Sequence, residues 1–322
     1  MPDLGMLFYY HRTRGPSQLA SLTRMLEGEG VSHAFTCEAF NDAMVPLASM
    51  AAATKRITIG PAVANLAFRH PYCLAAAAAS VNELAQGRFV LGIGPGHAAM
   101  NSRGLGLDMR KPVSRTRDYV ACVRALLDGC GKPVDVVTER FQVRNLPLAW
   151  APEQRVPILL AALRPAMVQL AGEIGDGVML SNVPLRAIPQ LRRALDESAR
   201  AHGRDPSSVS LFAIVNTILR PSREEARQLL ADAYAAAYLG LEYYQQSLAS
   251  YGVEIREGLR LGDEDLDALA IGGPLEYARE RLTAYREAGV DLPILAPMGM
   301  LLPTPCDTNL EATYSHLALL AA

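Results

Sequence analysis

Three short segments of this 322-residue chain carry residue types that bind ligands or move protons. The first is GRFVLGIGPGHAAMNSRGLG (87–106), in which an apolar run enters a glycine-rich loop that lets the backbone approach a ligand closely. His97 follows the glycines, with Asn101 and Ser102 nearby. We predict a pocket histidine at His97, with a surface histidine in a plain turn as the alternative.

The second segment, TCEAFND (36–42), follows the apolar residues HAFT and contains Cys37 and Glu38. A carboxylate at the end of a strand can act as an acid or base, or it can orient a ligand. A helix-capping or salt-bridged glutamate would have the same sequence. Cys37 could be reactive, although buried structural cysteines are commoner.

The third segment is LRPAM (163–167), which joins an apolar run to a helical pattern. It places Arg164 and free backbone N–H groups at a helix N-terminus, and that arrangement attracts phosphate. The forked guanidinium also suits phosphate oxygens. The alternative is a solvated arginine beside an ordinary helix start.

Other candidates are weaker. Tyr238, Tyr243, Tyr244 and Tyr251 could line the site of a flat substrate, but their helical spacing favours packing in a core. His11 follows the first apolar run. No His/Asp/Glu spacing resembles a metal site, and no G-x-S-x-G motif indicates a hydrolase.

The elements that must position these residues alternate between strand and helix. Eight apolar runs predict strands at 4–10, 33–36, 57–63, 88–94, 157–162, 177–181, 209–219 and 291–297. Helices are predicted between most of them, at 17–29, 41–54, 71–84, 112–127, 165–175, 185–202 and 222–251, with one more before the last strand. Eight such units indicate an α/β fold, the (β/α)₈ TIM barrel. A doubly wound open sheet is the alternative, but no G-x-G-x-x-G follows the first strand.

We expect a single barrel domain over 1–322, with insertions at about 129–156 and 238–273 that shape a pocket at the C-terminal face of the strands. The third strand is unusual. In TIGPAVANLAFRHP (58–71), Gly60 and Pro61 interrupt a run that should be buried, and central strands avoid proline.

Composition excludes several functions. The net charge is −2 and no basic cluster is present, so nucleic acid is not an expected partner. The cysteines are scattered and odd in number, which favours a reducing cytoplasm over a disulfide framework: Cys37, Cys73, Cys122, Cys130 and Cys306. We expect no signal peptide and no membrane span.

Four passages together resemble the bacterial luciferase-like superfamily of flavin and deazaflavin oxidoreductases. They are ITIGPAVANLAFRHP, NELAQGRFVLGIGPG, KPVSRTRDYVACVRALL and VPILLAALRPAMVQLAGEIGDGVMLSN. The resemblance is greatest to the branch that uses the deazaflavin coenzyme F-420, which includes methylenetetrahydromethanopterin reductase. It implies a TIM-barrel oxidoreductase that passes hydride between F-420 and a small organic substrate, and it implies a homodimer.

The resemblance also assigns positions. It implies a cis peptide bond at Ala62–Val63, where the third strand bulges behind the deazaflavin ring, and a ring-contacting polar residue at Asn65. The remaining cofactor positions would be Cys37, Pro95, Gly96, Ala162, Leu163, Arg164, Ala166 and Met167. Glu38 and His97 would be catalytic, and Ser181 and His11 would meet the substrate.

Several residues depart from the pattern. Cys37-Glu38 stands where relatives often carry Asp-His, and His97 stands where the sugar-phosphate dehydrogenases carry a catalytic glutamate. Pro184 replaces their substrate-phosphate lysine, which argues against glucose 6-phosphate. Leu163-Arg164 replaces a Gly-Gly pair. Two alternatives stay open: a reduced-FMN monooxygenase of the same superfamily, and a protein that binds the cofactor without turnover.

Overall fold

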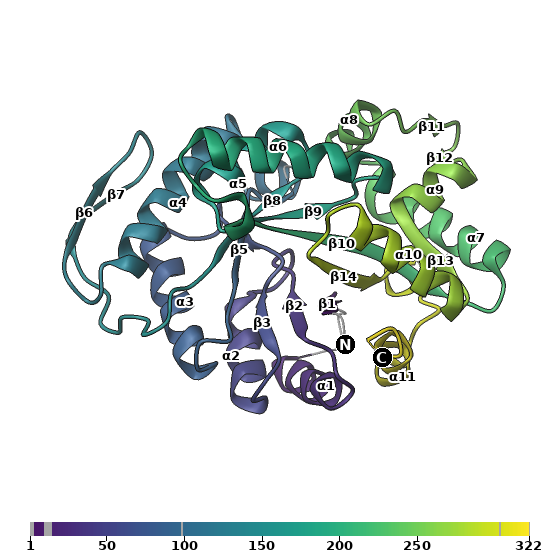
Figure 1. The fold of residues 1–322 in the computed structure, drawn as a ribbon, viewed down its shortest axis with the longest axis horizontal. Helices are drawn as coiled ribbons and strands as arrows, with labels where there is room; N and C mark the ends of the chain where they lie inside the picture. The colour runs from purple at the N-terminus through teal and green to yellow at the C-terminus, as the bar shows by residue number, and fades with distance from the viewer. Residues whose placement is uncertain (1–2, 10–14, 98, 303, 322) are drawn as a thin grey trace.

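The computed structural model describes residues 3–9, 15–97, 99–302 and 304–321, and within them a parallel sheet closes into a barrel. Helices surround this sheet (Figure 1). The strands are β1 (Gly5–Phe8), β2 (His33–Thr36), β3 (Thr58–Pro61), β4 (Ala64–Asn65), β5 (Leu91–Gly94), β8 (Ile158–Ala162), β9 (Gly177–Ser181), β10 (Ser210–Leu219), β13 (Ala270–Gly273) and β14 (Leu292–Pro297). Their order is β3-β2-β1-β14-β10-β9-β8-β5-β4, and β13 pairs with β10.

The interrupted third strand closes the barrel. β3 pairs with β2, whereas β4 pairs with β5, so the two short pieces occupy one strand position with a break between them. Counted this way, the path contains eight parallel positions, which confirms the predicted TIM barrel.

Most helices lie where the sequence predicts them. They are α1 (Pro16–Gly28), α2 (Met44–Ala53), α3 (Pro71–Leu84), α4 (Pro112–Asp128), α5 (Pro165–Ile174), α6 (Ile188–Ala201), α7 (Arg223–Tyr234), α8 (Glu242–Ser250), α9 (Asp263–Leu269), α10 (Leu275–Glu287) and α11 (Leu310–Ala318). Proline begins α1, α3, α4 and α5, because its fixed φ suits the first turn and its missing N–H costs nothing there.

Several segments differ from the prediction, and the helix α11 had not been predicted. The single helix expected over 222–251 is divided into α7, a π-helix η4 (Ala235–Leu239) and α8. The strand β13 was not predicted, because four residues that include two glycines carry little strand signal. A second π-helix, η1 (Ala99–Gly104), lies in the predicted loop after β5.

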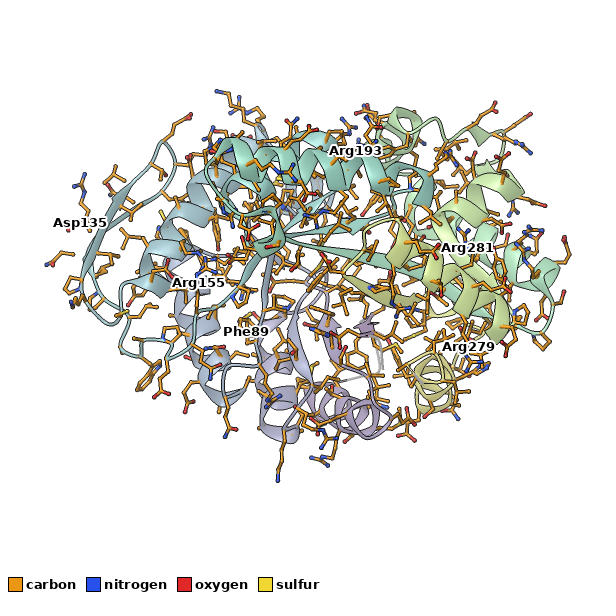
Figure 2. The ribbon with its side chains drawn as sticks, viewed as in Figure 1. Phe89, Asp135, Arg155, Arg193, Arg279 and Arg281 are labelled. Carbon is orange, nitrogen blue, oxygen red and sulfur yellow. The ribbon has the colours of Figure 1, made fainter. Side chains whose placement is uncertain are left out.

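Both predicted insertions contain small antiparallel hairpins outside the barrel sheet. Residues 129–156 include β6 (Val134–Val137) and β7 (Gln142–Leu146), a hairpin that extends away from the barrel with Asp135 on it (Figure 2). Residues 238–273 include α8, β11 (Ile255–Arg256), β12 (Arg260–Leu261) and α9.

The barrel interior is an apolar cluster contributed by alternate residues of the strands. It comprises Leu7, Phe35, Ala62, Val90, Leu159, Met179, Leu292, Ile294 and Ala296. Tyr9, Cys37 and Val63 pack against this cluster and are partly buried. They stand at the ends of the first three strands, so they form part of the mouth, where TIM barrels place their sites.

Candidate active site

At the break in the third strand, glycines pack so closely against neighbouring protein atoms that a side chain would not fit. A Cβ on Gly60 would lie 2.1 Å from the Val90 carbonyl oxygen, and one on Gly92 would lie 2.3 Å from that of Pro61. A Cβ on Gly94 would lie 2.7 Å from Val63 Cγ2. These close contacts show that the three glycines let β3, β5 and Val63 approach one another. The Ala62–Val63 peptide bond is cis, as expected.

Asn65 lies directly after this break and is 1% exposed. Its side-chain amide pairs with that of Asn101, and Asn101 Nδ2 also donates to the Pro95 carbonyl oxygen at 2.8 Å. The π-helix η1 positions Asn101 for this pairing. Gly96 has φ +68°, and a Cβ there would lie 2.4 Å from Asn65 Nδ2. The predicted residues Asn65, Pro95 and Gly96 therefore lie together.

Glu38 is 5% exposed and uses both carboxylate oxygens. Oε1 accepts from the Ala43 N–H at 3.1 Å and from Arg69, and Oε2 accepts from the Asn65 N–H at 2.8 Å. Burial raises the pKa of the Glu38 carboxyl above its ordinary value, against the opposing effect of Arg69 and the two N–H donors. The side chain thus fixes the ends of β2 and β4 relative to each other.

His97 is half-buried in the loop after β5, and its ring lies 5.6 Å from the ring of Tyr244 on α8. Burial lowers the pKa of His97 below its ordinary value. The imidazole is therefore neutral near pH 7, the form that accepts a proton at one ring nitrogen and donates a hydrogen bond from the other.

The predicted phosphate turn lies between β8 and α5, and α8 packs on it. Tyr251 and Ser247 both donate to the Leu163 carbonyl oxygen, at 2.8 and 3.0 Å. Arg164 donates to Gln246 at 3.1 Å and lies 5.3 Å from the centre of the Tyr243 ring. Its Nε atom is buried and has no partner among the described residues.

The other predicted positions differ in exposure. Ala162 and Met167 are buried in the core between sheet and helices, whereas Ala166 is exposed at the start of α5. The Cys37 thiol donates to the Phe8 carbonyl oxygen at 3.7 Å. Ser181 ends β9 and accepts from Asn182 Nδ2 at 3.1 Å. His11 lies outside the described residues.

Sequence reasoning missed a polar cluster at the ends of β1, β9 and β10. The Tyr9 and Tyr238 hydroxyl oxygens lie 3.2 Å apart, and Tyr9 also reaches Asn216 Oδ1 at 3.5 Å. Asn216 Nδ2 donates to Asn182 Oδ1 at 3.0 Å. One signal was available, because Asn216 is a polar residue near the end of an otherwise apolar strand.

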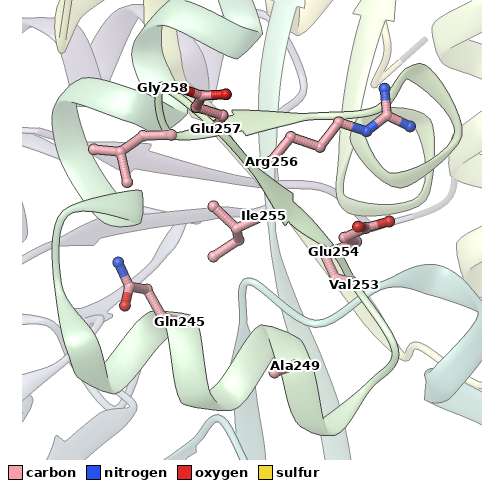
Figure 3. Close-up of a pocket in the computed structure, with 9 residues that line it drawn as sticks. Gln245, Ala249, Val253, Glu254, Ile255, Arg256, Glu257 and Gly258 are labelled. Carbon is pink, nitrogen blue, oxygen red and sulfur yellow. The ribbon is translucent and has the colours of Figure 1, made fainter.

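A groove lies beside α8, within the insertion over 238–273. Its volume is about 650 Å³, and Figure 3 shows it between α8 and the segment around β11. It is lined by Gln245, Ala249, Val253, Glu254, Ile255, Arg256, Glu257, Gly258 and Leu259. None of these residues was predicted to bind cofactor or substrate.

Two kinds of feature are absent from the described residues. None of the described helices combines the length and apolar character needed to cross a membrane. Among the same residues, no group of three or more His, Cys, Asp or Glu side chains is arranged to hold a metal ion.

Comparison with known proteins gives consistent similarities. The model of the luciferase-like monooxygenase family matches residues 6–292. A 5,10-methylenetetrahydromethanopterin reductase of Archaeoglobus fulgidus is 26% identical over 295 residues, covering 85% of this chain and 87% of the reductase. A 4-hydroxyprotoasukamycin monooxygenase of Streptomyces nodosus is 30% identical over 198 residues, covering 58% of this chain and 53% of the monooxygenase. The fold resembles that of an F-420-dependent secondary alcohol dehydrogenase, with a TM-score of 0.81, 17% identity, and coverage of 100% and 99% of the two chains.

Proposed function

Because the chain belongs to the luciferase-like monooxygenase family, we propose that it is an oxidoreductase that binds coenzyme F-420 at the barrel mouth and acts on a small organic substrate. One observation carries the choice of cofactor. The match to the methylenetetrahydromethanopterin reductase spans most of both chains, whereas the match to the monooxygenase spans little more than half of each.

The residues at the mouth fit such a cofactor. Arg164 has a buried Nε without a described partner and stands at the N-terminus of α5, a suitable setting for a phosphate. Leu163 and Ala166 belong to the same turn. The segment Ala62–Val63, together with Asn65, Pro95 and Gly96, would lie against the ring. When bound, F-420 supplies the carbon that exchanges hydride with the substrate.

The proposed roles of the two candidate catalytic residues differ. His97, neutral near pH 7, would exchange a proton with the bound molecules. Glu38 would hold Arg69 and the Asn65 backbone in place through its carboxylate. Cys37 would lie beside Glu38, and Ser181 would face the substrate. If activity were unchanged in both Glu38→Gln and His97→Ala, this assignment would be wrong.

The alternative is a reduced-FMN monooxygenase, which the monooxygenase relative favours. Titration of the purified protein with F-420 and with FMN, each oxidised and reduced, separates the two. We expect micromolar binding of F-420 and much weaker binding of FMN. Micromolar binding of FMN alone would overturn the proposal.

We further infer a single-domain homodimer of the cytoplasm that does not bind nucleic acid. The resemblance supports the dimer, and the five scattered cysteines support a reducing compartment. Light scattering should give about twice the 34.7 kDa mass of one chain. A monomeric mass at micromolar concentration would contradict the dimer.

A further inference from the structure

Tyr9 and Tyr238 form a hydroxyl pair that the proposed function leaves without a role. Tyr9 follows β1 and Tyr238 belongs to η4, and their oxygens are 3.2 Å apart. Tyr9 packs against the same barrel-interior cluster as Cys37 and Val63. Tyr9 therefore stands on the same side of the barrel as Val63, against which the deazaflavin ring is proposed to rest, and Tyr238 reaches it from η4.

The neighbouring amides determine which atoms face the pair. Asn216 Nδ2 donates to Asn182 Oδ1 at 3.0 Å and to the Tyr234 hydroxyl at 2.8 Å. Both Asn216 hydrogens are thereby used, so its Oδ1 atom faces Tyr9, 3.5 Å away. Asn182 has φ +51° directly after β9, and its Oδ1 atom is the acceptor in this cluster.

Two hydroxyl hydrogens can be arranged in two ways within this geometry. In one, Tyr238 donates to Tyr9, and Tyr9 donates across a long 3.5 Å to Asn216. In the other, Tyr9 donates to Tyr238 across the shorter 3.2 Å, and the Tyr238 hydrogen becomes available to a ligand oxygen. A ligand oxygen that accepts from Tyr238 favours the second arrangement. The bond from Tyr238 to the ligand then takes the place of the long bond from Tyr9 to Asn216.

The environment also distinguishes the two phenols. Burial raises the pKa of both, so both keep their hydrogens at neutral pH. At Tyr238, hydrogen bonds from Tyr9 and Asn182 act against burial and lower the pKa, whereas at Tyr9 the contact with Tyr238 raises the pKa further. Tyr238 therefore has two neighbours, Tyr9 and Asn182, that can stabilise its oxygen after a proton has left.

We propose that Tyr238 is a catalytic residue that binds an oxygen atom on the substrate carbon exchanging hydride, with Tyr9 and Asn182 as its positioning residues. This inference rests on the proposed F-420-dependent function, and it defines the substrate class as a ketone or aldehyde and the corresponding alcohol. A substrate whose reacting carbon bears only carbon and hydrogen, or a nitrogen without a lone pair, lacks the required acceptor.

The step balances in the direction of reduction. The carbonyl carbon accepts a hydride with its two electrons from reduced F-420, forming a C–H bond while the C=O π bond breaks. The Tyr238 proton passes to the carbonyl oxygen and forms the O–H bond of the alcohol. The Tyr238 oxygen then regains a proton from solvent through Tyr9. In oxidation each transfer is reversed.

The test uses [2-¹³C]acetone, the smallest ketone, with the full-length protein in the presence and absence of oxidised F-420, which cannot reduce it. A hydrogen bond to the carbonyl oxygen moves the ¹³C resonance downfield. We expect this shift with the wild-type protein, its loss in Tyr238→Phe and its reduction in Tyr9→Phe. Tyr277→Phe is the control, because Tyr277 accepts a bond from Arg223 at 3.0 Å outside the site.

Activity gives a second readout. With reduced F-420 and a series of small ketones, Tyr238→Phe should lower kcat about 100-fold or more, the usual size of a proton-transfer contribution. No ¹³C shift in the wild type, or an equal shift in Tyr238→Phe, would overturn the inference. A separate F-420 titration of each protein tests the proposed function, so a failure of cofactor binding is distinguished from a failure of the phenol pair.

Discussion

The side-chain amides of Asn65 and Asn101 donate to each other, from Asn65 Nδ2 at 2.9 Å and from Asn101 Nδ2 at 3.2 Å. Further hydrogen bonds extend from both residues of this pair. The Asn65 N–H donates to Glu38, and the Asn101 N–H donates to the His97 carbonyl oxygen at 2.9 Å. A hydrogen-bonded path therefore connects the two residues that sequence reasoning selected as catalytic.

Replacing Asn101 should remove the acceptor of the buried Asn65 Nδ2 group. Asn101→Ala should lower the free energy of unfolding by about 1–3 kcal/mol, the cost of an unsatisfied buried polar group. Urea unfolding of Asn65→Ala, Asn101→Ala and the double variant measures the coupling between the two. We expect the double variant to lose less than the sum of the single losses, and additive losses would refute the pairing.

The glycines around the strand break should not tolerate a methyl group. In Gly92→Ala the new Cβ meets the Pro61 carbonyl oxygen and the Val63 side chain, so β3 and β5 must separate. We expect a loss of about 1–3 kcal/mol in unfolding free energy and weaker F-420 binding. Gly104→Ala is the matched control, because a Cβ there meets nothing within 4 Å. Equal stability of the two variants would contradict this account.

Local sequence signals predicted the barrel strands well, and HAFT and GVMLS match β2 and β9 residue for residue. The division of the helix expected over 222–251 was not predictable, because the alanines of η4 suit a π-helix as well as an α-helix. The Tyr9–Tyr238 pair could not be predicted from the sequence either, because its residues are 229 positions apart. The glycines were recognised, but only the structure shows that Gly60 faces Val90 and that Gly92 and Gly94 face Val63.

Arg69 should control how the stability depends on pH through Glu38. The pKa of Glu38 in the folded state is raised above its ordinary value of 4.5, and Arg69 limits that rise. In Arg69→Met the pKa should rise further. As the pH rises above 4.5, the unfolded state releases the Glu38 proton before the folded state does. The free energy of unfolding should therefore fall as pH increases from 5 to 8. Adding Glu38→Gln should abolish this additional slope; a slope that persisted would exclude Glu38 as its source.

His33 should make the protein less stable in acid. It lies at the N-terminal end of β2 between Phe35 and Phe212, and burial lowers the pKa of His33 to about 4. Between pH 6.5 and 4 the unfolded state binds the proton that the folded state rejects. The free energy of unfolding should therefore fall by about 2–3 kcal/mol across this window and be fully retained above it.

His33→Phe isolates this contribution, because a phenylalanine ring fills a similar space without titrating. The pH dependence of urea unfolding should become shallower in this variant, by comparison with the wild type and with His316→Asn at an exposed position. Identical slopes in His33→Phe and the wild type would show that His33 does not supply the effect.

The contact between α8 and the turn after β8 should determine how firmly that turn holds the cofactor. Tyr251 and Ser247 both donate to the Leu163 carbonyl oxygen, one residue before Arg164. Tyr251→Phe and Ser247→Ala should each weaken F-420 binding roughly fivefold, because one neutral hydrogen bond contributes about 1 kcal/mol. Ser80→Ala, which removes a hydroxyl donating to Ala76 within α3, should leave the affinity unchanged. An unchanged Kd for F-420 together with a lower Tm in the α8 variants would mean that this contact stabilises the fold without shaping the site.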